Sequence, residues 1–325
     1  MLGDLQTVLT TYEKKIEKGW EVNFLHYLTS LKKIKKTNSC IKKINSDRDS
    51  FFGIYSSVSN YAKDKYDIRY KGQNIVSLQN GSVIDIANNI DDYFHSFPKD
   101  IIGKPLWESI GLLHNISEKK EIKSKEHLFE SRLLKYLNSS KKKILRHITP
   151  VTIKGLFFQM PTFFKASEHG EEEFSLAGGG IDILARIKRR KVSPKKENCI
   201  CIMELKDSIS KGNEEPFQII QQAMAYACCI QQLIRSEHGQ EWYDIFRGKN
   251  NSKKIPTPLV LYACVVVPFG NGFQKDNIPE SYKIEEELSF ENGDKLRLRY
   301  LYLEMNENYT EIISEPVTNL ELKSL

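Results

Sequence analysis

Runs of apolar residues divide the second half of the chain into strand-like and helix-like segments. Residues 199–205 (CICIMEL) and 259–267 (LVLYACVVV) are almost continuously apolar, which is typical of strands covered on both faces. Residues 181–187 (IDILARI) form a third strand-like segment, and a helix-like segment separates 199–205 from 259–267. Strands interrupted by a crossover helix predict an α/β fold with a central mixed β-sheet flanked by helices.

The helix-like segment is expected to begin near Asn213 and to extend to about Ser236. Asn213 is a suitable N-cap, and Pro216 is acceptable in the first helical turn. Apolar residues recur at helical spacing, and an adjoining stripe repeats every fourth position. The members of this stripe are Gln218, Gln222 and Tyr226. For Gln222 the alternative is an amide at the boundary of a packed helix.

Other segments of the second half of the chain are expected to add strands to the sheet and a helix that packs against it. A helix is expected from Glu126, followed by a strand-like stretch over residues 154–166. Residues 296–304 alternate in the manner of an edge strand, and residues 309–322 are expected to add another. The Pro and Gly residues that follow position 267 predict a loop that borders the substrate cleft.

The first 115 or so residues differ from the rest of the chain in their pattern of apolar and polar positions. Residues 5–35 have helical spacing, and Asn80-Gly81 is a turn signal among mixed short segments. No repeat and no catalytic pattern occurs there. We therefore expect a mainly helical N-terminal accessory domain over residues 1–120 and a second domain over residues 121–325.

Candidate catalytic residues lie on or directly after two of these strand-like segments, at Asp182, Glu204 and Lys206. Glu-x-Lys occurs five times in the chain, but only Glu204 and Lys206 end an apolar strand that a helix follows. Side chains alternate along a strand, so these two share one side while Leu205 points to the other. If residues 181–187 pair beside this strand, Asp182 faces Glu204 across the ladder. The alternative is a buried ion pair in which one of the acids merely compensates Lys206.

Two converging carboxylates favour a bound cation. Like charges at such a distance repel each other unless a cation neutralises them, and oxygen ligands favour a hard ion such as Mg²⁺ or Mn²⁺. An ion held there would lower the pKa of an attacking water and stabilise charge on phosphate oxygens. The ammonium of Lys206 would add a compact positive charge beside the phosphate.

The order of these residues resembles the PD-(D/E)xK nuclease superfamily, which has the restriction-endonuclease-like fold, over about residues 124–270. The matching residues are Asp182, Glu204, Lys206, Gln222 and Tyr226. The resemblance implies that the two acids bind metal, that the lysine assists hydrolysis, and that the glutamine and tyrosine line the site. Our predicted metal-binding residues are accordingly Asp182, Glu204 and Leu205.

The family also has an acidic residue on the helix before the core strands. Glu130 and Glu126 are the two candidates, and we prefer Glu130 because it borders an apolar helix face. Two features depart from the family pattern. Ile181 stands where the family name has proline, and a basic insertion lengthens the segment between Asp182 and Glu204.

Composition supports an ordinary globular protein, since 40% of the 325 residues are hydrophobic. The start shows no signal-peptide pattern and no apolar run approaches the roughly 18 residues of a membrane span, so we expect a soluble, cytoplasmic protein. The six cysteines form no C-x-x-C pair, which favours reduced thiols in the core. The chain contains no H-E-x-x-H pattern, so its sequence gives no support for zinc catalysis.

The net charge of +6 is unevenly placed. Residues 186–196 include seven basic residues and no acid. This segment begins at the end of the strand-like segment that carries Asp182 and continues beyond it. Basic side chains beside a metal site would attract a phosphate backbone. The predicted nucleic-acid contacts are Arg186, Lys188, Arg189, Arg190 and Lys191. The alternative is a solvated hairpin tip.

These observations predict a nuclease that requires Mg²⁺ or Mn²⁺ and hydrolyses phosphodiester bonds in DNA. Asp182, Glu204 and Lys206 are its central groups, supported by Glu130, Gln222 and Tyr226. The alternative is a catalytically inactive module that retains the fold and binds nucleic acid or protein. Oligomeric state is open, although cleavage of both strands favours a homodimer.

Overall fold

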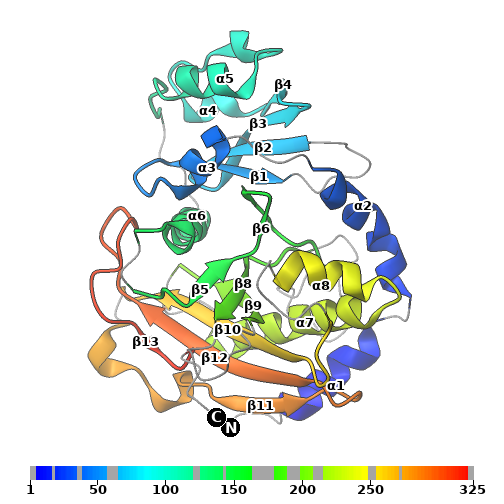
Figure 1. Cartoon of the computed structure of the whole chain (residues 1–325). Helices are drawn as coiled ribbons and strands as arrows, with labels where there is room; N and C mark the ends of the chain where they lie inside the picture. The colour runs from blue at the N-terminus through cyan, green and yellow to red at the C-terminus, as the bar shows by residue number, and fades with distance from the viewer. Residues whose placement is uncertain are drawn as a thin grey trace. The chain divides into compact units, whose positions relative to one another are not determined.

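The structure is a computed structural model of the chain, and it describes residues 5–16, 19–34, 39–56, 65–119, 125–141, 144–162, 179–188, 198–207, 215–247, 254–270 and 273–320. Contacts divide the chain into two units (Figure 1). The C-terminal unit consists of residues 1–24, 142–151 and 159–325, and the N-terminal unit of residues 25–141 and 152–158. Residues 1–24 thus group with the C-terminal unit, and residues 121–141 and 152–158 with the N-terminal unit, on the other side of the expected boundary near residue 120 in each case.

The C-terminal unit contains a seven-stranded mixed sheet in the order β11-β12-β10-β9-β8-β5, with β13 also paired to β12. Strands β9, β10 and β12 are parallel to one another, and the remaining pairings are antiparallel. The expectation of an α/β fold with a mixed sheet is therefore confirmed. The strands are β5 (Ile148–Pro150), β8 (Ile183–Lys188), β9 (Asn198–Leu205), β10 (Val260–Pro268), β11 (Glu286–Ser289), β12 (Lys295–Leu303) and β13 (Val317–Thr318).

The apolar runs of the sequence form the centre of this sheet. Every residue of β9 after Asn198 and every residue of β10 after Val260 is buried, as expected for strands covered on both faces. The prediction that residues 296–304 form an edge strand is wrong. Strand β12 lies inside the sheet, paired to β10 on one side and to β11 and β13 on the other.

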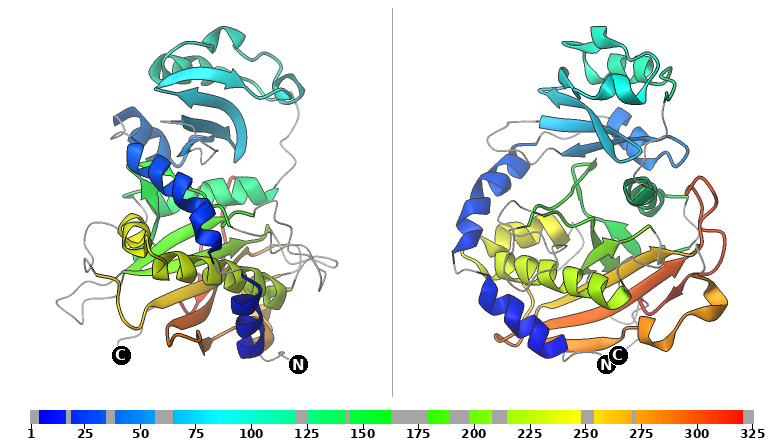
Figure 2. Two further views of the ribbon diagram at one scale, coloured as in Figure 1. Left: turned by 90° about the vertical axis from the view of Figure 1, so that its right-hand side faces the viewer. Right: turned by 180° about the vertical axis from the view of Figure 1, so that it is seen from behind.

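Three helices pack in the C-terminal unit. Helix α7 (Pro216–Arg235) connects the parallel strands β9 and β10 and packs against both, and α8 (Gly239–Arg247) follows it. The view from behind in Figure 2 shows α7 crossing the sheet strands, with α1 (Leu5–Lys15) beside it. Short 3-10 turns complete the unit at Trp20–Phe24 (η1), Lys275–Asn277 (η3) and Glu280–Tyr282 (η4).

The start of α7 is fixed by a capping box. The Glu215 main-chain N–H donates to Oε1 of Gln218 at 2.9 Å, and the Glu215 side chain accepts from the first turn in return. Pro216 is the first helical residue, and Ser236 is the C-cap. The expected N-cap, Asn213, lies outside the described residues.

Helix α1 is tied to the far edge of the same sheet. The Gln6 side-chain amide donates to the Ser289 carbonyl at 2.8 Å and accepts from the Ser289 N–H at 3.0 Å. Glu13 Oε1 accepts from the Glu291 N–H at 3.1 Å. These contacts occupy backbone groups of β11 and of the turn after it, which would otherwise be an open sheet edge.

The N-terminal unit contains a six-stranded sheet in the order β4-β3-β2-β1-β7-β6. Its hairpin between β3 and β4 turns at Asn80 and Gly81, whose φ values of 53° and 84° match the predicted turn. The expected helices are present, but the sheet was not foreseen. The strands are β1 (Phe52–Ser56), β2 (Lys65–Tyr70), β3 (Gln73–Gln79), β4 (Ser82–Ile86), β6 (Thr152–Ile153) and β7 (Leu156–Phe157). The helices are α2 (Leu25–Lys33), α3 (Ser39–Ser46), α4 (Ile90–Tyr93), η2 (Lys99–Ile101), α5 (Leu106–Leu113) and α6 (Lys125–Asn138).

A buried lysine links two helices of the N-terminal unit. Lys135 on α6 is fully buried, and its ammonium donates to the carbonyls of Ile44 at 2.8 Å and Asp47 at 3.0 Å. Both acceptors lie at the C-terminal end of α3, where carbonyls lack helical partners. Burial, with a contribution from nearby Arg132, lowers the pKa of Lys135 to about 7.

All six cysteines are free, and all except Cys40 are buried, which confirms the expectation of reduced core thiols. Among the described residues, no helix is long and apolar enough to cross a membrane.

Candidate functional site

The pairing of β8 with β9 brings the two predicted acids together. The strands run antiparallel with Ile183 opposite Met203, and one further step places Asp182 opposite Glu204. Residues directly opposite in an antiparallel pair point to the same face, with Cβ atoms about 4.5–5.5 Å apart. Asp182, in a bend just before β8, and Glu204, the next-to-last residue of β9, are therefore neighbours in the chain at the end of this ladder.

The carboxylate of Asp182 is fixed by the backbone of β9. Its Oδ2 accepts from the Leu205 N–H at 2.8 Å, so it takes the place of a ladder carbonyl where β8 begins. The chain before it is held by another ladder, since the Ile181 N–H donates to the Met160 carbonyl at 2.9 Å. Asp182 is thus anchored on both sides.

Glu204 and Lys206 end the central strand. Glu204 is only 5% exposed, whereas Lys206 is partly exposed. The Lys206 N–H donates to the Val266 carbonyl at 3.1 Å and so continues the parallel ladder between β9 and β10. Because the extended backbone continues to this point, the Lys206 side chain lies on the same face as Glu204.

Helix α7 covers that face. In the register, Val265 of β10 lies beside Glu204, and Val265 packs in one apolar cluster with Ile219 of α7. Gln222 is one helical turn beyond Ile219 and Tyr226 one turn further, and both are buried. Gln222 thus lies on the second turn of α7, the helix that follows β9 in the chain and packs against it.

The site lies at the edge where the parallel strands end. The carboxyl ends of β9, β10 and β12 meet there, together with the first turn of α7. Tyr282 of η4 donates its hydroxyl to Glu215, and Tyr302 of β12 donates its hydroxyl to the Tyr282 carbonyl at 2.7 Å. These bonds hold the start of α7 against the strand ends.

The donor set of the C-terminal unit fits a hard divalent ion. Two carboxylates are adjacent, and Leu205 between Glu204 and Lys206 can contribute only backbone groups. In the described part of the chain, no group of three or more His, Cys, Asp or Glu side chains forms a metal site. Mg²⁺ is commonly held by one or two carboxylates and completes its shell with water and phosphate oxygens. Asp182 and Glu204 meet that requirement.

Glu130 belongs to the N-terminal unit. It lies on α6 and is 6% exposed, and it borders the buried apolar residues Phe129 and Leu133, as predicted. Its charge contributes to raising the pKa of the buried Tyr55 hydroxyl, although burial of that hydroxyl has the larger effect. The alternative acid, Glu126, is partly exposed.

The predicted nucleic-acid contacts differ in environment. The Arg186 guanidinium donates to the carbonyls of Phe246, Ile245 at 3.1 Å and Pro150 at 3.3 Å, and burial lowers its pKa to about 10. It anchors α8 to β8, about 13 Å along the strand from Asp182. Lys188 is exposed. Arg189, Arg190 and Lys191 lie outside the described residues.

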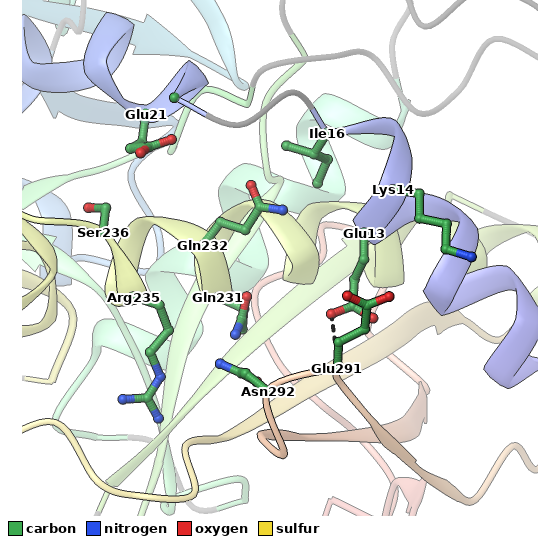
Figure 3. A pocket seen from close by; sticks show the side chains of 11 residues that line it. Glu13, Lys14, Ile16, Glu21, Gln231, Gln232, Arg235, Ser236, Glu291 and Asn292 are labelled. Atoms are coloured by element: carbon green, nitrogen blue, oxygen red, sulfur yellow. Dashed lines mark hydrogen bonds between the residues drawn. The ribbon is translucent and has the colours of Figure 1, made fainter.

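A pocket of about 710 Å³ lies elsewhere in the C-terminal unit. Residues of α1, the second half of α7 and the turn after β11 line it, among them Glu13, Gln232, Arg235 and Asn292 (Figure 3). Gln232 is ten residues beyond Gln222 on α7, or about 15 Å along the helix. The pocket is therefore separate from the paired carboxylates.

Three residues at the site were not singled out from the sequence. Asp207 directly follows Lys206, and its position beside the Glu-x-Lys pattern was an available signal. Tyr282 and Tyr309 come from distant segments and carry no local signal of their roles. Burial raises the pKa of Tyr309, and the charge of Asp207 adds to this effect.

Comparison of the chain with models of protein families, with curated proteins and with solved structures gives no match.

Proposed function

We propose that the C-terminal unit is a divalent-metal-dependent nuclease of the PD-(D/E)xK type, with a restriction-endonuclease-like core, that hydrolyses phosphodiester bonds in DNA. The observation that supports it most is that the β8–β9 ladder ends at Ile183 opposite Met203, directly before Asp182 and Glu204, and that the Asp182 carboxylate accepts from the Leu205 N–H. Charged groups at the end of a buried strand require compensation. A cation shared by the two acids supplies it.

Each residue has a defined part in this proposal. Asp182, Glu204 and the backbone of Leu205 hold the ion, and the Leu205 N–H fixes the orientation of Asp182. A bound Mg²⁺ or Mn²⁺ lowers the pKa of water and neutralises charge on phosphate oxygens. Lys206 places an ammonium beside the phosphate, where it stabilises the negative charge that develops during cleavage.

Helix α7 supports the same chemistry. Its first turn points toward the strand ends, and the positive end of a helix dipole favours a phosphate there. In this proposal the amide of the buried Gln222 orients water or phosphate, and the buried Tyr226, one helical turn further along α7, lines the site. The exposed Lys188 would attract the DNA backbone, and the basic residues that follow it in the sequence lie outside the described residues. The free thiols fit a reducing compartment, so we propose the cytoplasm.

Cleavage assays with the full chain test the proposal. Plasmid and single-stranded DNA are incubated with Mn²⁺, with Mg²⁺, or with a chelator. We expect cleavage only with metal, and Lys206→Ala should lower the rate by about 100-fold or more without changing the circular dichroism spectrum. Lys15→Ala is the matched control. Lys15 is an exposed residue in another Glu-x-Lys, on α1, and this variant should cleave DNA at the wild-type rate.

Two outcomes contradict the proposal. Wild-type cleavage rates in Lys206→Ala would remove the lysine from the mechanism. Retention of DNA without cleavage at any metal concentration would instead support a binding module. Metal affinity gives an independent readout: titration calorimetry with Mn²⁺ should show about tenfold weaker binding in Glu204→Gln, since Mg²⁺-type sites depend on few carboxylates.

A further inference from the structure

The pocket beside α1 and the second half of α7 is lined by three parts of the C-terminal unit. Its volume of about 710 Å³ is typical of pockets that hold small molecules. Ile16 directly follows α1, Gln232 belongs to α7, and Glu291 lies in the turn after β11 (Figure 3). A molecule bound there would contact elements that are far apart in the sequence.

One carboxylate oxygen in this pocket is buried without a hydrogen-bond partner. Glu13 Oε1 accepts from the Glu291 N–H at 3.1 Å, whereas Glu13 Oε2 is buried and has no partner among the described residues. Figure 3 shows the carboxylates of Glu13 and Glu291 side by side. Burial raises the pKa of Glu13, and the charge of Glu291 adds to this effect while the Glu291 N–H opposes it. A buried carboxylate requires a donor or a cation, so this oxygen is where a ligand would bind.

Arg235 does not supply that cation. Its guanidinium donates to the Asp294 carboxylate at 2.8 Å to Oδ2 and 2.6 Å to Oδ1, and to the Pro256 carbonyl at 2.9 Å. Among the described residues, the other cation that lines the pocket is Lys14, which is exposed. The protein's own cations therefore leave the acids of the pocket largely unbalanced.

The acids lie at two separate places in the pocket. Glu21 of η1 lies apart from Glu13 and Glu291, and Gln232 lies between them (Figure 3). In the described part of the chain, no hydrogen bond or ion pair engages the carboxylate of Glu21 or of Glu291. Three acids against Lys14 leave two negative charges unbalanced. Two separated charges favour an elongated organic cation over a single metal ion.

The wall between the acids is uncharged. It includes Ile16, Gln231 and Gln232 (Figure 3). Gln232 Oε1 accepts from the Trp20 indole N–H at 2.5 Å, and Gln231 Nε2 donates to Asp294 at 2.9 Å. The amide oxygen of Gln231 is left as an acceptor, and Ile16 offers apolar contact. This wall suits a chain of methylene groups that carries N–H donors.

We propose that this pocket binds a linear polyamine, with one ammonium group at Glu13 and Glu291 and another at Glu21. An ammonium group donates three hydrogen bonds and accepts none, which matches carboxylate and amide oxygens. The methylene chain between the ammonium groups lies along the uncharged wall. A bound polyamine connects α1 to α7 and to the turn after β11, so it stabilises the docked position of α1. The inference does not depend on the nuclease proposal.

Titration calorimetry of the full chain with spermidine, in chelator and without DNA, tests the inference. One spermidine should bind per chain and raise the melting temperature, because a ligand of the folded state stabilises it. Glu21→Gln and Glu291→Gln should each weaken binding about tenfold, as expected for loss of a charged hydrogen bond. Neither carboxylate has a partner in the described structure, so both variants should keep the wild-type circular dichroism spectrum.

Two controls separate the pocket from general attraction between charges. Glu286 is exposed on β11 and does not line the pocket, so Glu286→Gln should bind spermidine within about twofold of wild type. Butylamine has a single ammonium group and should bind at least about tenfold more weakly than spermidine, since it can engage only one end of the pocket.

Four outcomes would overturn the inference. Spermidine that neither binds nor raises the melting temperature leaves the pocket without this ligand. Equal losses in Glu286→Gln and Glu291→Gln would show attraction by overall charge. Butylamine that binds as tightly as spermidine, or unchanged binding in Glu21→Gln, would remove the second ammonium position. Displacement of spermidine by Mn²⁺ in chelator-free buffer would assign the acids to a metal ion instead.

Discussion

The buried Lys135 gives the sharpest prediction for stability. Its pKa is about 7 in the folded protein against an ordinary value of 10.5, so the folded protein binds fewer protons than the unfolded chain between these values. Stability should therefore rise with pH across that interval. The shift of about 3.5 units corresponds to about 5 kcal/mol of penalty for the buried charge below pH 7. Between pH 7 and pH 9, about 2 kcal/mol of this penalty should be relieved.

Urea denaturation at pH 7, 8 and 9, under reducing conditions and followed by circular dichroism, measures this effect. Wild type should gain stability across the series, and Lys135→Met should lack this gain because the titrating group is gone. Lys99→Met is the control, since Lys99 is exposed and should leave the wild-type slope unchanged. Parallel curves for wild type and Lys135→Met would show that Lys135 does not titrate in this interval, and the argument from burial would be refuted.

Two further substitutions test the packing of α8. Arg186→Met removes three charged hydrogen bonds to backbone carbonyls and should cost about 3 kcal/mol or more in urea denaturation, while the salt dependence of DNA binding stays unchanged. A weakened salt dependence with normal stability would instead assign Arg186 to DNA contact. Gly239→Ala would place a Cβ 1.9 Å from the Ile234 carbonyl oxygen and should lower stability by about 3 kcal/mol. An unchanged melting temperature would contradict the close approach of α7 and α8.

The central elements were predictable because their signals are local. Strands β9 and β10 are covered on both faces, so their apolar runs identify them, and α7 is marked by Pro216 and helical periodicity. Strand β12 was mistaken for an edge because Arg297 and Arg299 alternate with apolar residues. Alternation reports that the two faces of a strand differ, whereas an edge is defined by missing backbone partners. The pattern does not carry that information.

The site shows the same division. Asp182, Glu204 and Lys206 were predicted as neighbours from strand alternation and chain order, and the pairing of β8 with β9 places Asp182 against Leu205. Arg186 was counted with the basic segment because charge is visible in a sequence and burial is not. Tyr309 has a left-handed backbone conformation in a hairpin that contains no glycine. The sequence therefore gives no glycine signal for this conformation. The docking of α1 joins positions far apart in sequence and has no local signal either.

The attachment of α1 to β11 has a consequence for how the chain folds during synthesis. Gln6 is synthesised 283 residues before its partner Ser289. Contacts of such sequence separation form late and slowly. The N-terminal unit is complete at residue 158 and can fold before α1 docks. A nascent chain therefore carries an undocked amphipathic helix until β11 has been made, and a fragment that starts after residue 24 would leave the flank of α7 permanently uncovered.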